Sequence, residues 1–292
     1  MSFVTKPNLN CNRARPLSRA RCFLAASTIL ISLALPSAAQ AETIDWDPRF
    51  WAEAGAYLPD ANTQIQLSLP DSDNGTVLSL EDDLGFETGV ESFDLTLGAK
   101  LDDDFFIEGS IFALDRKTSL TLSEAIEVED VVYDVGARID ADFSSEIFRI
   151  TLGYRIIANP KFDASIALGV HLTSFDFGII GEASANGQTA TGEQRGQDLL
   201  APLPTLTGQV KYRPIEWLEL RGRADYLDLT IDQYDGKLIN LEASATGAIT
   251  RNIALGAAYR FTDYKVGIDA ESYDGNIEYK FDGPRLFVRV IF

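Results

Sequence analysis

The residues best suited to chemistry in this sequence are charged side chains that recur at every second position of short segments. Glu219, Arg221, Arg223 and Asp225 form one such run, and apolar or small residues fill the positions between them. Because successive side chains of an extended strand point to opposite faces, each run places its charges on one face. If the strands close around an interior, one face of each strand lines it. The residues predicted to line this interior are Lys100, Glu108, Arg149, Arg155, Asp163, His171, Glu219, Arg221, Arg223, Asp225, Glu242, Arg260 and Arg289.

Charges that face an enclosed interior must pair, since an unpaired buried charge costs several kcal/mol. The favoured hypothesis is therefore an ion-pair network that fills and stiffens the interior. The alternative is a narrow polar channel that favours anionic solutes. Its basic wall would consist of Arg149, Arg155, Arg221, Arg223, Arg260 and Arg289. Both hypotheses stay open here, because side-chain packing decides between them.

His171 is the one histidine of the chain, and Thr173, Ser174 and Asp176 follow it closely. A hydrolase that uses these residues is the least favoured alternative. The sequence contains no G-x-S-x-G or H-E-x-x-H motif and no clustered metal-ligand spacing. We interpret His171 as part of the polar lining, and we predict a non-enzymatic protein without a cofactor.

Acidic residues are concentrated in the connections between the predicted strands. Oxygen-rich clusters can bind Ca²⁺ or Mg²⁺, but Asp71-Ser-Asp73-Asn-Gly75 departs from a calcium loop at Gly75. Solvated surface charge is the favoured interpretation, and divalent cations are the alternative. The residues concerned are Asp71, Asp73, Glu81, Asp82, Asp83, Glu124, Glu127, Glu129, Asp130, Glu271 and Asp274.

The first 41 residues are predicted to be a secretory signal peptide. A basic region is followed by the apolar segment Cys22–Leu35, and Ala39-Gln40-Ala41 supplies the small residues of a cleavage site. The predicted mature chain, residues 42–292, contains neither cysteine, which excludes a disulfide or thiolate-metal role. It keeps 20 of the 25 Lys and Arg residues and all 44 Asp and Glu residues, so its net charge of 20 − 44 = −24 argues against nucleic acid as a partner.

After residue 41 no apolar run approaches the roughly 18 residues of a membrane-spanning helix. Segments of about 10 alternating residues recur instead, as in Phe93–Leu101 and Phe148–Ile156. We predict ten strands, with 8 or 12 possible. The predicted tight turns are 102–104, 158–161, 213–216 and 250–252, and the longer connections are 59–89, 119–141 and 181–200.

Finer expectations concern the connections. Thr63–Leu69 alternates and should prolong the first strand, Asp45–Leu58. Gly181–Gln197 lacks periodicity and is predicted to be a mobile loop. Asp235-Gly236 and Asp274-Gly275 are typical of hairpin turns. In the last strand the apolar face changes across Asp282-Gly283-Pro284, which favours a bulge.

The final residues, Leu286–Phe292, alternate and end on an aromatic residue. Together with the aromatic residues beside the predicted short turns, this ending resembles the small monomeric outer-membrane β-barrels of Gram-negative bacteria. The resemblance implies an all-β, antiparallel, up-and-down transmembrane barrel formed by residues 42–292, with both termini in the periplasm. It also implies that Phe292 belongs to the signal read by the barrel-assembly machinery.

The resemblance further implies outer-membrane lipid and lipopolysaccharide as partners. Divalent cations that bridge the acidic loops to lipopolysaccharide phosphates stay the alternative to solvated surface charge. The favoured function is an integral component of the cell outer membrane with a structural or surface role and at most a narrow polar pore. A selective porin-like channel for small solutes is the alternative.

Overall fold

The computed structural model describes residues 44–68, 77–128, 131–185, 188–195, 199–231, 234–270 and 273–292. The chain divides into two units, 1–40 and 41–292, and all described residues belong to the second. The predicted signal peptide therefore lies outside the described residues. Among the described residues, no helix is long and apolar enough to cross a membrane.

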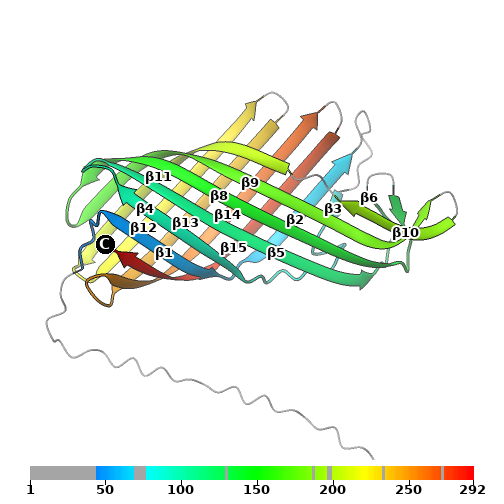
Figure 1. The fold of residues 1–292 in the computed structure, drawn as a ribbon, viewed down its shortest axis with the longest axis horizontal. Coiled ribbons are helices and arrows are strands. Elements are labelled where there is room, and N and C mark those ends of the chain that lie inside the picture. Colours follow the sequence, from blue (N-terminus) through cyan, green and yellow to red (C-terminus); the bar gives the residue numbers. More distant parts are fainter. Residues whose placement is uncertain are drawn as a thin grey trace, which may run out of the picture. The chain divides into compact units, whose positions relative to one another are not determined.

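Ten of the strands form a closed antiparallel barrel, which confirms the predicted fold and strand number (Figure 1). The last strand pairs with the first, with Trp51 opposite Ile291 and Tyr57 opposite Arg285, so the sheet has no open edge there. The ten strands are β1 (Phe50–Tyr57), β4 (Ser92–Lys100), β5 (Phe105–Thr121), β8 (Arg138–Ala158), β9 (Phe162–Ala185), β11 (Leu199–Ile215), β12 (Leu218–Ile231), β13 (Tyr234–Ala248), β14 (Ile253–Ala270) and β15 (Tyr273–Ile291).

The two ends of the barrel differ. At the end that we call the turn end, 101–104, 159–161, 216–217 and 249–252 join neighbouring strands, and the C-terminus lies there (Figure 1). The opposite end, the loop end, carries five further strands: β2 (Asp60–Ser68), β3 (Val77–Ser79), β6 (Ile126–Val128), β7 (Val131–Tyr133) and β10 (Gln188–Arg195). β2 pairs with β15 beyond β1, so the predicted prolongation of the first strand is confirmed.

Several predicted connections are wrong. Most of Gly181–Gln197 is a hairpin, because β9 continues to Ala185 and pairs with β10. Asp235-Gly236 and Asp274-Gly275 lie inside strands: Asp235 is opposite Thr230, and Asp274 is opposite Asp269. The first strand begins at Phe50 rather than Asp45, and β11 continues to Ile215, beyond the turn predicted from residue 213. Local turn composition misled here because pairing along the long strands sets where each hairpin ends.

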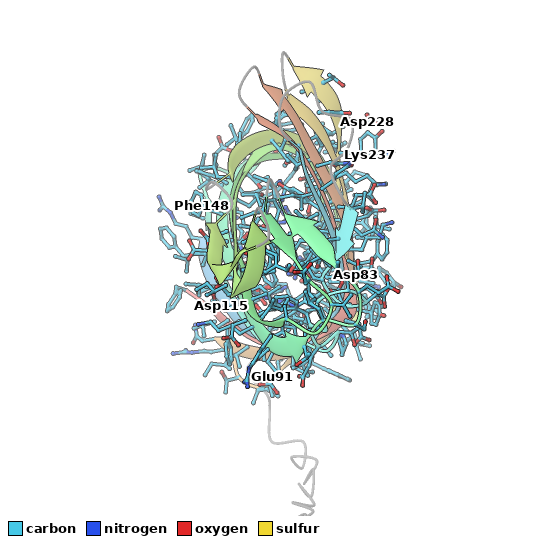
Figure 2. The ribbon with its side chains drawn as sticks, turned by 90° about the vertical axis from the view of Figure 1, so that its right-hand side faces the viewer. Asp83, Glu91, Asp115, Phe148, Asp228 and Lys237 are labelled. Atoms are coloured by element: carbon cyan, nitrogen blue, oxygen red, sulfur yellow. The ribbon has the colours of Figure 1, made fainter. Side chains whose placement is uncertain are left out.

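The outer wall carries an apolar belt next to the turn end. Outward positions such as Leu97, Leu152 and Leu286 are exposed, as expected of side chains that face lipid. Exposed aromatic residues mark the edge of the belt at the turn end: Phe50, Phe105, Tyr154, Tyr212, Trp217 and Phe292. Toward the loop end, outward positions become polar. Figure 2, which views that end, shows Asp228 and Lys237 directed outward.

The interior shows the reverse pattern of the outer wall: it is charged near the turn end and apolar near the loop end. Strand β15 illustrates this change. Ile277, Tyr279 and Phe281 are buried inside near the loop end, and Arg285 and Arg289 are buried on the same face near the turn end. Pairing of β15 with β14 runs from Tyr273 to Val290 without a register shift, so the bulge predicted at Asp282–Pro284 is wrong. The apolar side chains change face because the outside of the barrel changes from lipid to water.

Gly283 marks where β15 exchanges one partner for another. Asp282 pairs with Asp60 of β2, whereas Arg285 pairs with Tyr57 of β1. A Cβ atom at residue 283 would lie 2.4 Å from the carbonyl oxygen of Leu58, so glycine is required for this close backbone approach.

Candidate functional site: a filled barrel interior

The half of the interior beside the turn end is a layer of ion pairs centred on Glu53 of β1, which is 2% exposed. One carboxylate oxygen of Glu53, Oε1, accepts hydrogen bonds from Arg221 Nη1 and Arg289 Nε, both at 2.9 Å. The other oxygen accepts from Arg221 Nη2 at 3.2 Å and from Arg285 Nη1 at 3.4 Å. Three arginines from two strands thus converge on one carboxylate from a third strand.

Arg221 and Arg285 extend this cluster to two more carboxylates. Arg221 Nη2 donates to Glu242 at 3.1 Å, and Arg260 Nη2 donates to the second oxygen of Glu242 at 2.7 Å. Arg285 donates to both oxygens of Asp94, from Nε at 2.8 Å and from Nη2 at 2.5 Å. This two-point geometry is the strong form of an arginine–carboxylate pair.

A second cluster lies on the opposite wall, where β5, β8, β11, β12 and β13 meet. Asp225 accepts from Arg149 Nη1 at 3.1 Å and Arg223 Nε at 3.1 Å, with Thr207 and Asn240 as further donors. Arg223 Nη1 also donates to Glu108 at 2.6 Å. The buried carboxylates of both clusters are therefore matched by several donors each, as burial of charge requires.

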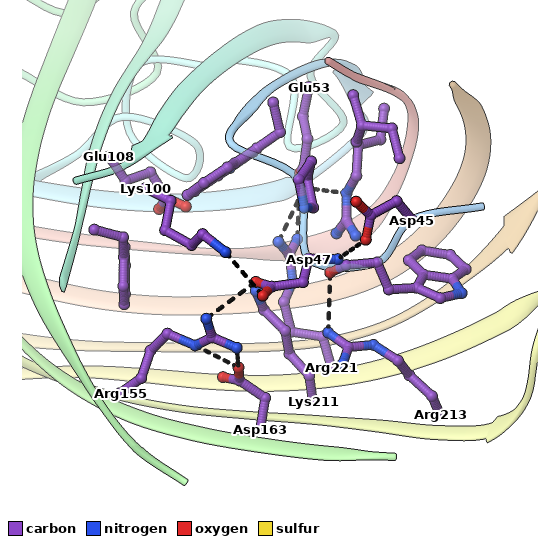
Figure 3. A pocket seen from close by; sticks show the side chains of 16 residues that line it. Asp45, Asp47, Glu53, Lys100, Glu108, Arg155, Asp163, Lys211, Arg213 and Arg221 are labelled. Carbon is purple, nitrogen blue, oxygen red and sulfur yellow. Dashed lines mark hydrogen bonds and ion pairs between the residues drawn. The ribbon is translucent and has the colours of Figure 1, made fainter. Parts of the chain in front are cut away.

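The chain before β1 folds across the mouth of the barrel at the turn end (Figure 3). Asp47 pairs with Lys100 at 2.8 Å and Arg155 at 3.0 Å, and Arg155 pairs also with Asp163 at 2.8 Å. Although partial burial raises the pKa of Asp47, the hydrogen bond from Lys100 and the charge of Arg155 outweigh it and lower that pKa below its usual value of 3.8. Asp47 therefore stays charged.

Trp46 fixes the same segment from the other side. Its indole Nε1 donates to the carbonyl of Glu216 at 2.7 Å, and Arg213 Nη2 donates to the carbonyl of Trp46 at 3.2 Å. Arg213 also pairs with Glu219, whose other oxygen accepts from Arg289 Nη1 at 2.7 Å. We call residues 45–48 the strap, because these contacts hold them over the mouth.

His171 lies inward on β9, 5% exposed, directly opposite Arg149 of β8. Its Nδ1 has no hydrogen-bond partner among the described residues. Ser174 and Asp176 are at even positions and His171 is at an odd one, so the alternation of a strand directs them to the opposite face of β9. Thr173 shares the inward face, and its hydroxyl is hydrogen-bonded to that of Tyr264. The structure thus brings together no triad of His171, Ser174 and Asp176.

The interior half toward the loop end is an aromatic and aliphatic core, which the sequence analysis did not predict. The rings of Phe112 and Phe281 stack at 5.5 Å between centroids, and Tyr57 packs edge-on against Phe112 at 5.9 Å. Tyr279 contacts Phe281 at 4.8 Å and Phe143 at 5.7 Å. The sequence does contain a signal for this core: within single strands, the apolar residues shift from odd to even positions or the reverse, and so from one strand face to the other.

The segment that follows β3 closes this core at the loop end. Leu80 and Leu84 are fully buried in it, and Phe86 is nearly so. Arg116 of β5 holds the segment through Nη2, which donates to Glu81 at 2.6 Å and to the carbonyl of Glu87 at 2.8 Å. Glu81 therefore belongs to a buried ion pair rather than to an exposed acidic cluster.

Two small cavities lie beside the ion-pair layer. One, of about 50 Å³, is bounded by the strap and by the charged side chains beneath it. The other, of about 60 Å³, separates the ion pairs from the aromatic core and is lined by His171, Arg149 and Tyr264. Each has room for only a few waters.

The structure places all thirteen residues of the predicted lining on inward positions of the barrel strands. Twelve of these residues form ion pairs, and His171 forms none with the part of the chain that the structure describes. Six further charged residues on inward strand positions are absent from the predicted lining: Glu53, Asp94, Arg116, Lys211, Arg213 and Arg285. Alternation with small or apolar neighbours was the signal that could have found them.

The predicted acidic clusters are only partly covered by the structure. Asp71, Asp73, Glu129, Asp130 and Glu271 lie outside the described residues. Among the residues that are described, no group of three or more His, Cys, Asp or Glu side chains could hold a metal ion.

No protein-family model matches the chain, and no curated protein matches it by sequence. Among solved structures, the chain is similar to the outer membrane protease OmpT of Escherichia coli, with 12% identity, a TM-score of 0.56, and coverage of 86% of this chain and 99% of that one. It is also similar to the translocator domain of the autotransporter NalP from Neisseria meningitidis, with 10% identity, a TM-score of 0.43, and coverage of 85% and 90%. The toluene transporter TodX of Pseudomonas putida matches at 9% identity and a TM-score of 0.36, over 84% and 90% of the two chains.

At such identities a structural likeness speaks for the fold alone. The likeness to OmpT defines the class: this chain has the fold of an outer-membrane β-barrel. Because the identity to OmpT is 12%, it transfers no activity to this chain.

Proposed function

We propose that this protein is an integral outer-membrane barrel with a structural or surface role, neither an enzyme nor an open channel. One observation carries the proposal: two successive layers fill the interior, first ion pairs and then aromatic rings. A solute that entered at the turn end would have to separate the strap from Lys100 and Arg155 and then Glu53 from its arginines. It would next meet the stacked rings of Phe112 and Phe281.

The proposed location and partners follow from the outer wall. The exposed apolar belt fits outer-membrane lipid on the turn-end side. Beyond it, cross-strand pairs such as Lys265–Glu278, at 2.7 Å, present charge at the level of lipid headgroups and of lipopolysaccharide phosphates. Export with cleavage after Ala41 and periplasmic termini belong to the same proposal, as does a monomeric state.

Single-channel conductance of the refolded mature chain, residues 42–292, in a planar bilayer tests this proposal. Folding of the sample is established first by heat-dependent gel mobility. We expect no discrete conductance steps, because each layer alone blocks the lumen. Discrete steps whose ion selectivity reverses on charge reversal at Arg221 and Arg223 would refute the proposal and establish the porin-like alternative.

A further inference from the structure

The cavity beneath the strap is lined by more cations than its neighbouring carboxylates can pair with directly (Figure 3). The cations are Lys100, Arg155, Lys211, Arg213, Arg221 and Arg289, and the carboxylates are Asp45, Asp47, Glu53, Glu108 and Asp163. Five of the six cations form ion pairs within the barrel mouth or the layer behind it. Among the described residues, Lys211 has no carboxylate within the 4.0 Å of an ion pair.

Two carboxylates on the strands beside Lys211 already have partners. Asp163 lies opposite Lys211 on β9, and its Oδ2 accepts from Arg155 at 2.8 Å. Glu219 pairs with Arg213 through one oxygen and with Arg289 through the other. On its other side, Lys211 faces Arg221 of β12 in direct register, so two cations stand side by side.

Two further features concern the positive charge of residues that line the cavity. Lys211 Nζ lies 5.9 Å from the ring centroid of Trp51, which contributes only a weak cation–π attraction. Arg289 is 6% exposed, and its Nη2 is buried without a hydrogen-bond partner among the described residues. Lys211 and Arg289 are both among the residues that line this small cavity, where a missing counter-charge is costly.

We propose that this cavity is a binding site for a small inorganic anion of halide size, with Lys211 as its principal ligand and Arg289 as the second. The cavity volume of about 50 Å³ suits a monatomic anion with a water molecule and is too small for gluconate. Asp47, which is half exposed, forms the outer edge of the site, so the anion enters from the turn end and does not cross the aromatic core.

The test measures thermal unfolding of the refolded mature protein in detergent, in sodium chloride and in sodium gluconate at equal ionic strength. We expect a saturable rise in Tm with chloride and none with gluconate, which is too large for the cavity. In Lys211→Met the chloride dependence should be lost, whereas Lys211→Arg should keep it. Lys237→Met is the matched control, because Lys237 points outward and pairs with Asp228, and it should respond to chloride as the parent does.

A crystal grown in bromide supplies a readout that does not depend on stability. An anomalous peak in contact with Lys211 Nζ is expected in the parent protein and absent in Lys211→Met. Equal Tm shifts in chloride and gluconate, or an unchanged chloride response in a folded Lys211→Met protein, would overturn the proposal. A bromide crystal without a peak at Lys211 would also overturn it and would show that the lysine is accommodated without a counter-ion.

Discussion

Arg285 offers the sharpest test of the ion-pair layer, because it joins the last strand to the first two strands of the barrel. It is 1% exposed and contacts both Asp94 and Glu53. In Arg285→Met, Glu53 keeps its ion pairs with Arg221 and Arg289. Asp94 loses its ion pair with Arg285, although the aspartate is only 7% exposed and its charge stays buried. We expect a loss of about 3–5 kcal/mol of unfolding free energy, the range found when one partner of a buried pair is removed.

The double variant Asp94→Leu/Arg285→Met separates this explanation from simple loss of packing. Replacing both partners by apolar residues leaves no orphaned charge, so most of the lost stability should return. The coupling energy of the double-mutant cycle should therefore approach 3 kcal/mol, at the upper end for contacting residues. Gly55 supports the geometry: a Cβ atom there would lie 2.8 Å from Asp94 Oδ1 and 2.9 Å from Arg285 Nε.

The assay is equilibrium unfolding in urea of the protein refolded in phospholipid vesicles, followed by heat-dependent gel mobility and tryptophan fluorescence. Lys280→Met is the control on the same strand: Lys280 points outward with its side chain 45% exposed, so the change should lie within about 0.5 kcal/mol. If Arg285→Met is as stable as the parent, or if the two single changes are additive, the ion pairs of Arg285 do not stabilise the barrel.

Two further predictions concern the aromatic core and the C-terminus. Phe281→Ala should cost about 3–5 kcal/mol in the same unfolding assay, because the ring packs against Tyr57, Phe112 and Tyr279; a cost below that of the lipid-facing Phe148→Ala would contradict the packed core. Deleting Phe292, which is 70% exposed, should sharply lower the yield of folded barrel in cells and leave refolding into vesicles nearly unchanged; equal loss in both settings would mean that Phe292 acts through stability rather than as an assembly signal.

Much of the barrel could be predicted from single strands. Alternation in segments such as Phe93–Leu101 indicated strands, and their number and antiparallel order are confirmed by the closed sheet. The hairpin positions could not be predicted as reliably, because Asp235-Gly236 and Asp274-Gly275 have turn composition but lie inside paired strands. Pairing over the full strand length outweighs the preference of two residues.

The sequence by itself determined which residues face inward near the turn end, because the alternation of side chains along a strand depends only on neighbouring positions. Glu219, Arg221, Arg223 and Asp225 could be placed on one face from their spacing alone. Which charges pair is decided only by the tertiary structure, because Glu53 meets Arg221 across 168 positions of the chain. The aromatic core also depends on the tertiary structure: one strand face becomes apolar toward the loop end, and the sequence of a single strand, such as that around Asp282–Pro284, suggests a bulge equally well.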